Sequence, residues 1–537
     1  MAHNFADLFE HAVDAVPDRV ALIVGDRQVT YRELDDRANR LAHHLVDAGL
    51  GEGSHIGIHM HNAIETIETI FAAFKMRAVP ITVNYRYTSD ELAYLYDNAD
   101  LEALVYHRSY APVVGQVLPS VSKLRYSLVV DEPGEQETAA TEGTSVRYDD
   151  ALATGSAERD FGERSGDDKY ILYTGGTTGR PKGVVWRQED IWRVLAGGTD
   201  FYSGEPAPDE YHQSRIGAAA AEPMRWLLLP PLIHTSALMP TCNALFSGNT
   251  VILDAHFDPH GTWQIVQRHR PQIIVITGDA MGRPLVDALI SGSYDPSGLA
   301  VVASGAALFS QSVKDAVFDA IPGVLVSDSV GSSETGFSGI GLASQGLVQK
   351  GGPRIGAGRG TFVLDDEDRP VTAGEGWLAK KGHVPFGYYN DPVRSAEIFR
   401  TVDGERVVVT GDRARVEDDG TITLLGRGNM VVNTGGEKVF AEEVEAVVKA
   451  HPEVFDAIVI GVPDERWGQR VAAVIRPREA GRLNVGDLEQ HTRGALAGYK
   501  IPRSIWLSDT IERTPSGKPD YRWAHEFASK TIAHYTI

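Results

Sequence analysis

The chain has 537 residues, which is too long for one hydrophobic core and predicts two or more domains. Its 51 basic and 73 acidic residues give a formal net charge of -22, which argues against nucleic acid or an anionic membrane surface as the main partner. No apolar run approaches a membrane span, and the amino terminus lacks the order of a signal peptide. The single cysteine, Cys242, excludes an internal disulfide and fits a cytoplasmic location. A buried side chain is favoured there over a nucleophile.

The first hundred residues alternate between helix and strand patterns. Thr30 and Glu33 form a capping-box pattern before a helix expected at 31–48. Strands are expected at 55–60, 79–83 and 101–106, and helices at 64–75 and 89–98. Such units indicate an α/β fold with a mostly parallel sheet covered by helices. Five histidines between positions 43 and 61 are interpreted as core or surface side chains rather than metal ligands.

The remaining elements divide into a long middle part and a separable end. Residues 131–168 and the glycine-rich stretch 339–360 are expected to be irregular. Between them the pattern predicts strands at 225–229, 250–253, 273–277, 299–304 and 324–328, and helices at 190–196 and 310–320. In the C-terminal part, the pattern predicts strands at 421–425, 457–462, 471–475 and 504–507, a turn at 426–429, and helices at 441–450 and 485–497. We therefore expect a large domain at 1–426 and a small α+β domain at 427–537.

Residues 173–183 read YTGGTTGRPKG and have the composition of a phosphate-binding loop. Glycines allow positive φ and bring backbone N–H groups close to an anion, while threonine hydroxyls add donors and Lys182 adds charge. The loop is not of the Walker A type, because Arg180 and Pro181 stand between Gly179 and Lys182. Taken alone, a surface linker is an equal alternative.

The order of these residues resembles the nucleotide loop of the adenylate-forming (ANL) superfamily of acyl-CoA synthetases, luciferases and peptide-synthetase adenylation domains. Further segments resemble motifs of the same superfamily in the same order: residues 229–234, 304–308, 328–336, 410–420, 426–445 and 513–522. The resemblance covers nearly the whole chain. It implies a large N-terminal domain of layered sheets covered by helices and a small mobile C-terminal domain.

The resemblance implies a role for each matching residue. The residues expected to hold the β- and γ-phosphates of ATP are Thr174, Gly175, Gly176, Thr177, Thr178, Gly179 and Lys182. Those expected along the adenine and α-phosphate are Ser304, Gly305, Ala306, Asp328, Ser329, Val330, Gly331, Ser332 and Ser333. Glu334 would bind Mg²⁺, which takes carboxylate and phosphate oxygens. Asp412, expected to be buried between the apolar residues of two strands and assisted by Arg427, would accept from the ribose hydroxyls, although a lone aspartate after a glycine is ordinarily a turn residue.

Lys518 is expected to bridge the attacking carboxylate and the α-phosphate, and the catalytic set is completed by Glu334, Thr178 and Lys182. The resemblance implies that coenzyme A is faced by Gly435, Gly436 and Lys438. The acyl pocket would include His234, Thr235, Ala306 and Gly331, with a core role open for His234. The chain departs from the family pattern at the hinge, Asn429, and at Val330, where an aromatic residue is usual.

The implied activity is that of an AMP-forming acid–thiol ligase using ATP, Mg²⁺ and coenzyme A. The strings TGGTTGRPKGVVWR, GSSETG, NTGGEKVFAEEVE and GYKIPR look most like actinobacterial synthetases for long-chain, branched or sterol side-chain acids. We therefore expect a hydrophobic carboxylic acid as substrate. The alternatives are a ligase for an aryl acid and a catalytically idle nucleotide- or acyl-CoA-binding member, which the departures at Asn429 and Val330 would suit. A homodimer is left open.

Overall fold

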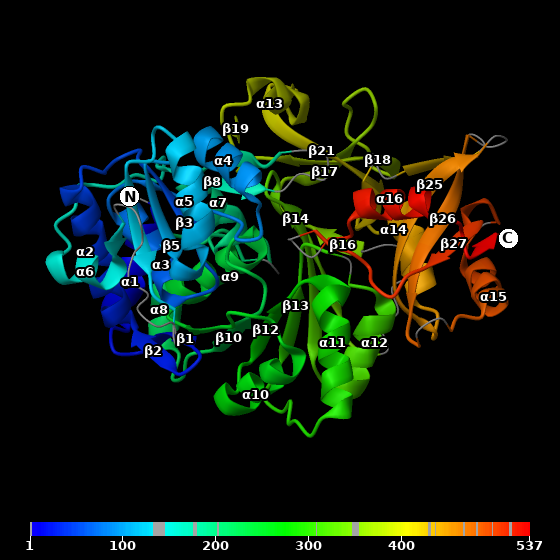
Figure 1. Ribbon diagram of the computed structural model, residues 1–537, viewed down its shortest axis with the longest axis horizontal. Helices are drawn as coiled ribbons and strands as arrows, with labels where there is room; N and C mark the ends of the chain where they lie inside the picture. Colours follow the sequence, from blue (N-terminus) through cyan, green and yellow to red (C-terminus); the bar gives the residue numbers. More distant parts are fainter. Residues whose placement is uncertain are drawn as a thin grey trace.

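The computed structural model describes residues 3–132, 145–174, 180–200, 203–307, 309–345, 354–427, 431–434, 437–464, 468–479, 482–496, 498–514 and 518–536. Figure 1 shows a large body built from the first four fifths of the chain and a smaller one at its carboxyl end. We call residues 431–536 the small domain and the preceding residues the large domain. The predicted α/β class with a separate C-terminal domain is confirmed.

The N-terminal sheet has the order β4-β3-β5-β6-β7, and all its strands are parallel. Its strands are β3 (His55–His59), β4 (Val79–Thr82), β5 (Ala103–His107), β6 (Tyr126–Val130) and β7 (Val146–Arg147). Helices α2 (Tyr31–Asp47), α3 (Ile64–Lys75), α4 (Ser89–Asn98), α5 (Ala111–Val117) and α6 (Tyr148–Thr154) connect or cover them. The capping box of Thr30 and Glu33 is present. The irregular segment predicted at 131–168 was wrong in part, because β7 and α6 lie within it.

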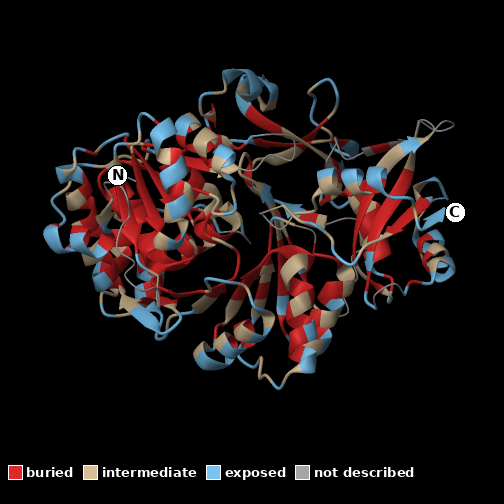
Figure 2. Cartoon of the chain, viewed as in Figure 1, coloured by how far each residue is buried: buried red, intermediate tan, exposed pale blue. Residues whose placement is uncertain are grey.

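The second sheet is centred on parallel strands in the order β14-β13-β12-β10-β11-β1. These strands are β1 (Val20–Val24), β10 (Arg225–Leu228), β11 (Thr250–Leu253), β12 (Ile273–Ile276), β13 (Val301–Ser304) and β14 (Leu325–Ser332), with β2 (Arg27–Thr30) antiparallel at the edge. Its helices are α9 (Thr235–Phe246), α10 (Pro259–His269), α11 (Gly278–Ser291) and α12 (Gln311–Ala320). Cys242 is buried in α9, as expected. Every residue of α3 is also buried, as Figure 2 shows for the interior of the large domain.

The large sheet continues through residues predicted to be loop. Strands β15 (Gly336–Ala343) and β16 (Arg354–Ala357) lie within or overlap the stretch 339–360, so that prediction was wrong. A Cβ on Gly339 would lie 2.4 Å from the carbonyl oxygen of Gly356. Glycine is used here because two strand backbones approach closely, and the same composition suggested a loop.

Antiparallel strands extend this sheet beyond β16, and a small third sheet stands beside it. The extension comprises β17 (Thr361–Leu364), β18 (Gly374–Lys381), β20 (Phe399–Val402), β21 (Glu405–Val416) and β22 (Ile422–Arg427). The third sheet has β8 (Lys169–Thr174), β9 (Lys182–Arg187) and β19 (Gly387–Tyr388), flanked by α7 (Gln188–Leu195) and α13 (Pro392–Ile398). Helices α1 (Phe5–Ala15) and α8 (His212–Ala219) pack against each other.

The small domain has its own sheet, in the order β24-β23-β26-β27-β28 with β25 paired to β26. Its elements are β23 (Val431–Thr434), β24 (Glu437–Phe440), α14 (Ala441–Lys449), β25 (Val454–Asp464), β26 (Gly468–Pro477), α15 (Val485–Ala495), β27 (Ser504–Leu507), α16 (Tyr521–Lys530) and β28 (Tyr535–Thr536). Two hydrophobic clusters consist entirely of its residues. The boundary at 426/427 stays a prediction. Among the described residues, no helix is both long enough and apolar enough to cross a membrane.

Candidate active site

The carboxyl ends of β13 and β14 bring two predicted motifs together. Ser304 and Asp328 are register partners in this parallel pair, and the Ser329 hydroxyl donates to the Ser304 carbonyl at 3.1 Å. Gly305 packs so closely that a Cβ there would lie 2.9 Å from Ser329 Oγ. Ala306 follows with φ of 66°, an uncommon conformation for a residue with a Cβ. The segments expected along the adenine are therefore adjacent at the sheet edge where α/β proteins bind ligands.

The side chain of Asp328 is committed to an internal ion pair. Its Oδ2 lies 2.8 Å from Nζ of Lys314 on α12, and both residues are buried. Burial raises the pKa of Asp328, while Lys314 opposes that shift. The predicted contact of Asp328 with adenine stays a prediction, and the structure gives this carboxylate a second role that the sequence did not indicate.

Glu334 stands on the turn of the tight β14–β15 hairpin. The backbone N–H of Ser332 donates to Thr335 Oγ1 at 3.0 Å, and the indole N–H of Trp186 donates to the Ser333 carbonyl at 2.9 Å. A Cβ on Gly331 would lie 2.0 Å from the carbonyl oxygen of Gly336, so the two sides of the hairpin are in contact. These interactions fix the backbone on both sides of the Glu334 carboxylate.

Tyr388 joins Glu334 to Lys182. Its hydroxyl donates to Glu334 Oε1 at 2.8 Å, and Nζ of Lys182 lies 4.9 Å from the centre of its ring. Lys182 begins β9 opposite Thr174, the last residue of β8, so the glycine loop connects an antiparallel hairpin. Burial, and next the charge of Arg394, lower the pKa of Lys182, while Glu334 opposes the shift. The lysine thus lies over the ring of Tyr388 and the carboxylate is bonded to its hydroxyl.

Sequence reasoning missed Tyr388 although a signal was present. The residue lies in the run FGYYN, where Gly387 has φ of 147° and allows β19 to pair with β9. A short aromatic run beside a glycine predicts a packed turn but not its neighbours. Only the pairing of β19 with β9 places Tyr388 beside Lys182.

The ribose pair lies on adjacent strands. Asp412 on β21 is the register partner of Arg427 on β22, and Thr410 Oγ1 donates to Asp412 Oδ2 at 2.5 Å. Asp412 is half-buried within a strand, so the turn alternative was wrong, and so was the expectation that apolar strands bury it. The Arg427 side chain lies outside the described residues.

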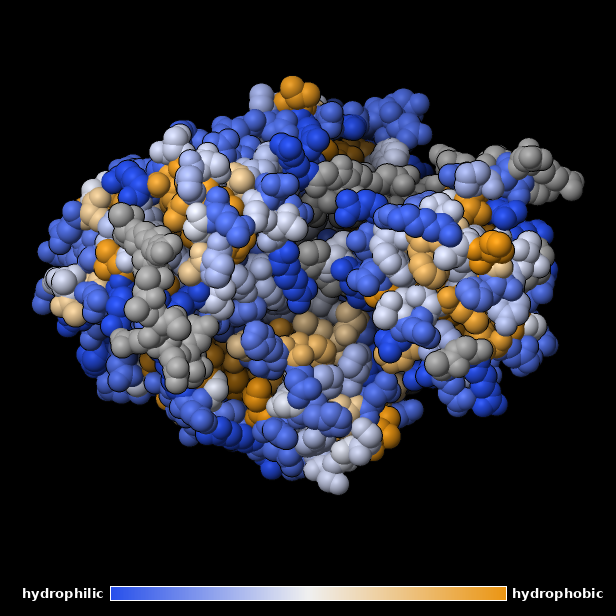
Figure 3. Space-filling view, in the orientation of Figure 1, coloured by the Kyte–Doolittle hydropathy of each residue, from blue (hydrophilic) through white to orange (hydrophobic). Residues whose placement is uncertain are grey.

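The segment 229–234 is fixed to the N-terminal part of the chain by Asn62. Its side-chain amide donates to the Pro230 carbonyl at 3.3 Å, and its oxygen accepts from the Leu232 N–H at 2.7 Å. His234 is then the N-cap residue of α9, and Thr235 is the first residue of the helix. Both are half-buried. Figure 3 shows this face of the molecule hollowed between the large body and the small domain, with apolar side chains gathered along the lower side of the hollow.

Lys518 lies in the segment that connects β27 to α16. Its carbonyl accepts from the N–H of Thr514 at 2.8 Å, and the neighbouring Arg513 binds Asp456 Oδ2 at 2.5 Å. In Figure 1 the segment leaves the small domain and runs toward β16 of the large sheet. The contact of Lys518 with substrate stays a prediction.

Several predicted residues lie outside the described part of the chain. These are Gly175, Gly176, Thr177, Thr178, Gly179, Asn429, Gly435 and Gly436. Lys438 belongs to β24, but its side chain is likewise not described. Val330 is half-buried and packs against the cluster formed by β16, β17, β18, β21 and β22.

The donor set at Glu334 fits a magnesium ion that also binds phosphate. Mg²⁺ is held in such sites by one or two carboxylates, with substrate phosphates and water completing the octahedron. Glu334 supplies one carboxylate, which Tyr388 orients, and Lys182 supplies a positive charge on the same side. These residues suit a metal–phosphate complex better than a metal alone.

The large domain carries the predicted phosphate loop and the acidic hairpin, and the small domain carries the segment with Lys518, as expected for a nucleotide-dependent enzyme of two domains. Residues 9–389 match the family model described as AMP-binding enzyme, and residues 443–518 match that of its C-terminal domain. The chain belongs to the AMP-binding enzyme family, which confirms the membership expected from the motifs.

Relatives match over nearly the whole length. The chain is 50% identical over 530 residues to a "Medium/long-chain-fatty-acid--CoA/3-oxocholest-4-en-26-oate--CoA ligase" of Mycobacterium tuberculosis, covering 98% of this chain and 96% of the relative. It is 48% identical over 535 residues to a "3-oxocholest-4-en-26-oate--CoA ligase" of Rhodococcus rhodochrous, with the same coverage. Among solved structures, the anthranilate CoA ligase AuaEII in complex with anthranoyl-AMP has a TM-score of 0.85 at 21% identity, covering 98% of both chains. That likeness supports the fold.

Proposed function

We propose that this chain is an ATP- and coenzyme A-dependent acyl-CoA synthetase for a hydrophobic carboxylic acid. The observation that carries the proposal is the full-length identity of about one half to ligases for medium- and long-chain fatty acids and a sterol side-chain acid. The juxtaposition of Lys182, Tyr388 and Glu334 supports it, since these are the groups needed beside a metal-bound polyphosphate.

The reaction has two steps. In the first, a carboxylate oxygen attacks the α-phosphorus of ATP, the bond from phosphorus to the pyrophosphate oxygen breaks, and acyl-AMP forms. In the second, the thiol of coenzyme A loses its proton and attacks the acyl carbonyl, and AMP leaves as the thioester forms. Both anions of the first step must be neutralised, which is the electrostatic task of such a site.

Each residue has a defined task in this scheme. Lys182 binds the β- and γ-phosphates together with the glycine loop, and Glu334 holds Mg²⁺, which polarises the phosphoryl oxygens when bound. Asp412 accepts hydrogen bonds from the ribose hydroxyls. Lys518 bridges the carboxylate and the α-phosphate, and His234 lines the path to the acyl group. We also propose that the protein is cytoplasmic and forms a homodimer. The domain boundary is proposed at 426/427, with Asn429 as the pivot.

The decisive experiment is a panel of acids assayed for coenzyme A-dependent AMP release. The panel runs from short chains through long and branched chains to sterol side-chain acids, with an aryl acid as the contrast. We expect hydrophobic acids to give AMP and thioester in equal amounts. AMP formation with the aryl acid alone would refute the substrate assignment, and pyrophosphate release with no acid would refute the ligase.

A further inference from the structure

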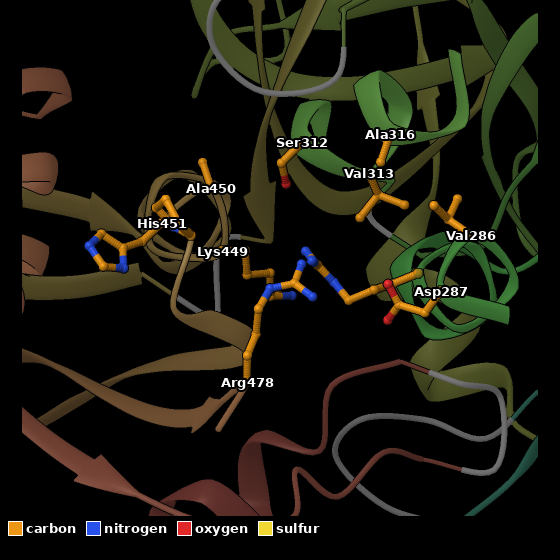
Figure 4. A pocket seen from close by; sticks show the side chains of 11 residues that line it. Val286, Asp287, Ser312, Val313, Ala316, Lys449, Ala450, His451 and Arg478 are labelled. Atoms are coloured by element: carbon orange, nitrogen blue, oxygen red, sulfur yellow. The ribbon is translucent and has the colours of Figure 1, made fainter. Parts of the chain in front are cut away.

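A cavity of about 190 Å³ lies where the large domain meets the small one, and none of its lining residues belongs to the predicted active site. Helices α11 and α12 form one wall. The end of α14 and the segment after β26 form the other, and Figure 4 shows Asp287 and Ser312 on the first side and Lys449 and Arg478 on the second. The volume is several times the ~30 Å³ that a water molecule occupies in the liquid. The cavity can therefore hold a small solvated ion.

Arg283 on α11 brings a buried cation with an unbonded donor to this cavity. Its side chain is nine-tenths buried, and its Nη2 is a buried donor without a hydrogen-bond partner among the described residues. It contacts Phe455 of the small domain, with 5.8 Å between the guanidinium carbon and the ring centre. Burial lowers the pKa of Arg283, Asp279 opposes that shift, and Arg478 lowers it further. A buried donor without a hydrogen-bond partner is costly, and an oxygen of a bound anion can accept from it.

Arg478 supplies a second cation from the small domain. No ion pair of its side chain occurs within the part of the chain that the structure describes. Lys449 also lines the cavity, but it is neutralised by Asp456 at 3.3 Å and by Glu445 at 4.0 Å. Asp287 is the acidic residue of the lining. With Lys449 neutralised, the two arginines outnumber the one aspartate of the lining, and Asp279 acts on Arg283 from outside the lining.

We propose that this cavity is a binding site for a small phosphate-class dianion, held by Arg283 from the large domain and Arg478 from the small domain. The planar guanidinium fork matches the oxygens of a phosphate, and two of them can bind one anion. Ser312, near the N-terminus of α12, adds a hydroxyl donor at the rim. Because the lining comes from both domains, the bound anion stabilises the domain arrangement seen here. The site does not depend on ligase activity.

Calorimetric titration of the full chain tests the site. Orthophosphate is one probe, and glycerol 3-phosphate is the other, so that a free anion is distinguished from a phosphate monoester. We expect saturable binding, weakened about tenfold or more by Arg283→Gln and likewise by Arg478→Gln, because each loses a charge-assisted hydrogen bond. Arg476→Gln is the matched control, since Arg476 carries the same charge two residues away but does not line the cavity. It should change the affinity by no more than about twofold.

The same variants distinguish phosphate binding in the cavity from phosphate binding at the active-site loop, because neither arginine belongs to that loop. Thermal unfolding without phosphate establishes that each variant is folded, and Arg283→Lys, which keeps the charge but not the fork, should weaken binding less than Arg283→Gln. Three outcomes would overturn the proposal: no saturable binding of either probe up to about 10 mM, an affinity that both glutamine variants leave unchanged, or a loss confined to one domain's arginine.

Discussion

Tyr388→Phe tests whether the tyrosine hydroxyl orients the metal-binding carboxylate. The substitution keeps the ring that lies 4.9 Å from Lys182 and removes the hydroxyl that donates to Glu334 at 2.8 Å. A hydrogen bond to a charged group contributes about 1.5–3 kcal/mol, and the half-exposed position of Glu334 favours the lower end. We therefore expect kcat/KM for MgATP to fall about tenfold.

The assay is acid-dependent exchange of pyrophosphate into ATP, measured over a range of Mg²⁺ concentrations. If the hydroxyl orients Glu334, the variant requires more Mg²⁺ for half-maximal exchange. Tyr389→Phe is the matched control, because its hydroxyl donates at 2.9 Å to Asp100, away from the phosphate site. An unchanged Mg²⁺ requirement in Tyr388→Phe, or an equal change in Tyr389→Phe, would refute the reasoning.

Three further predictions concern the lysine segment and the buried histidines. Lys518→Ala should lower acyl-adenylate formation on the order of a hundredfold while sparing thioester formation from supplied adenylate, and equal losses of both steps would contradict its role. Arg513→Met removes the bond to Asp456 that holds the same segment, and should lower the rate of adenylate formation about tenfold. Arg513→Lys should restore part of that rate, and the rate of thioester formation from supplied adenylate should be unchanged in both variants. Burial lowers the pKa of His59 to about 3, so the unfolded chain binds the proton first and stability falls as the pH drops below the ordinary histidine range. The free energy of unfolding should fall by about 2 kcal/mol at about pH 5, which lowers Tm. In His59→Leu, Tm should fall less steeply as the pH drops, whereas His260→Leu should show the same pH dependence of Tm as the unsubstituted chain.

Much of the fold followed from local patterns. Helices at 64–75 and 89–98 and strands at 250–253 and 504–507 have the predicted bounds. Each is either framed by capping and turn residues or strongly apolar, so short-range preferences and tertiary packing agree. The glycine-rich strands β15 and β16 were missed because glycine there reflects the approach of a neighbouring backbone, which a single sequence does not reveal.

The sequence by itself determined the family and predicted which residues form the site, because the motifs carry their residue types and order within short segments. Only the tertiary structure decided how these residues act on one another. Tyr388 lies more than two hundred residues beyond Lys182, and β19 must pair with β9 before the two meet. Asp328 is paired with Lys314 through packing of α12 on the sheet, and Arg283 meets Arg478 only across two domains. The charge of a side chain can be read from its residue type. The residue that neutralises it depends on which segments the fold brings within a few ångströms.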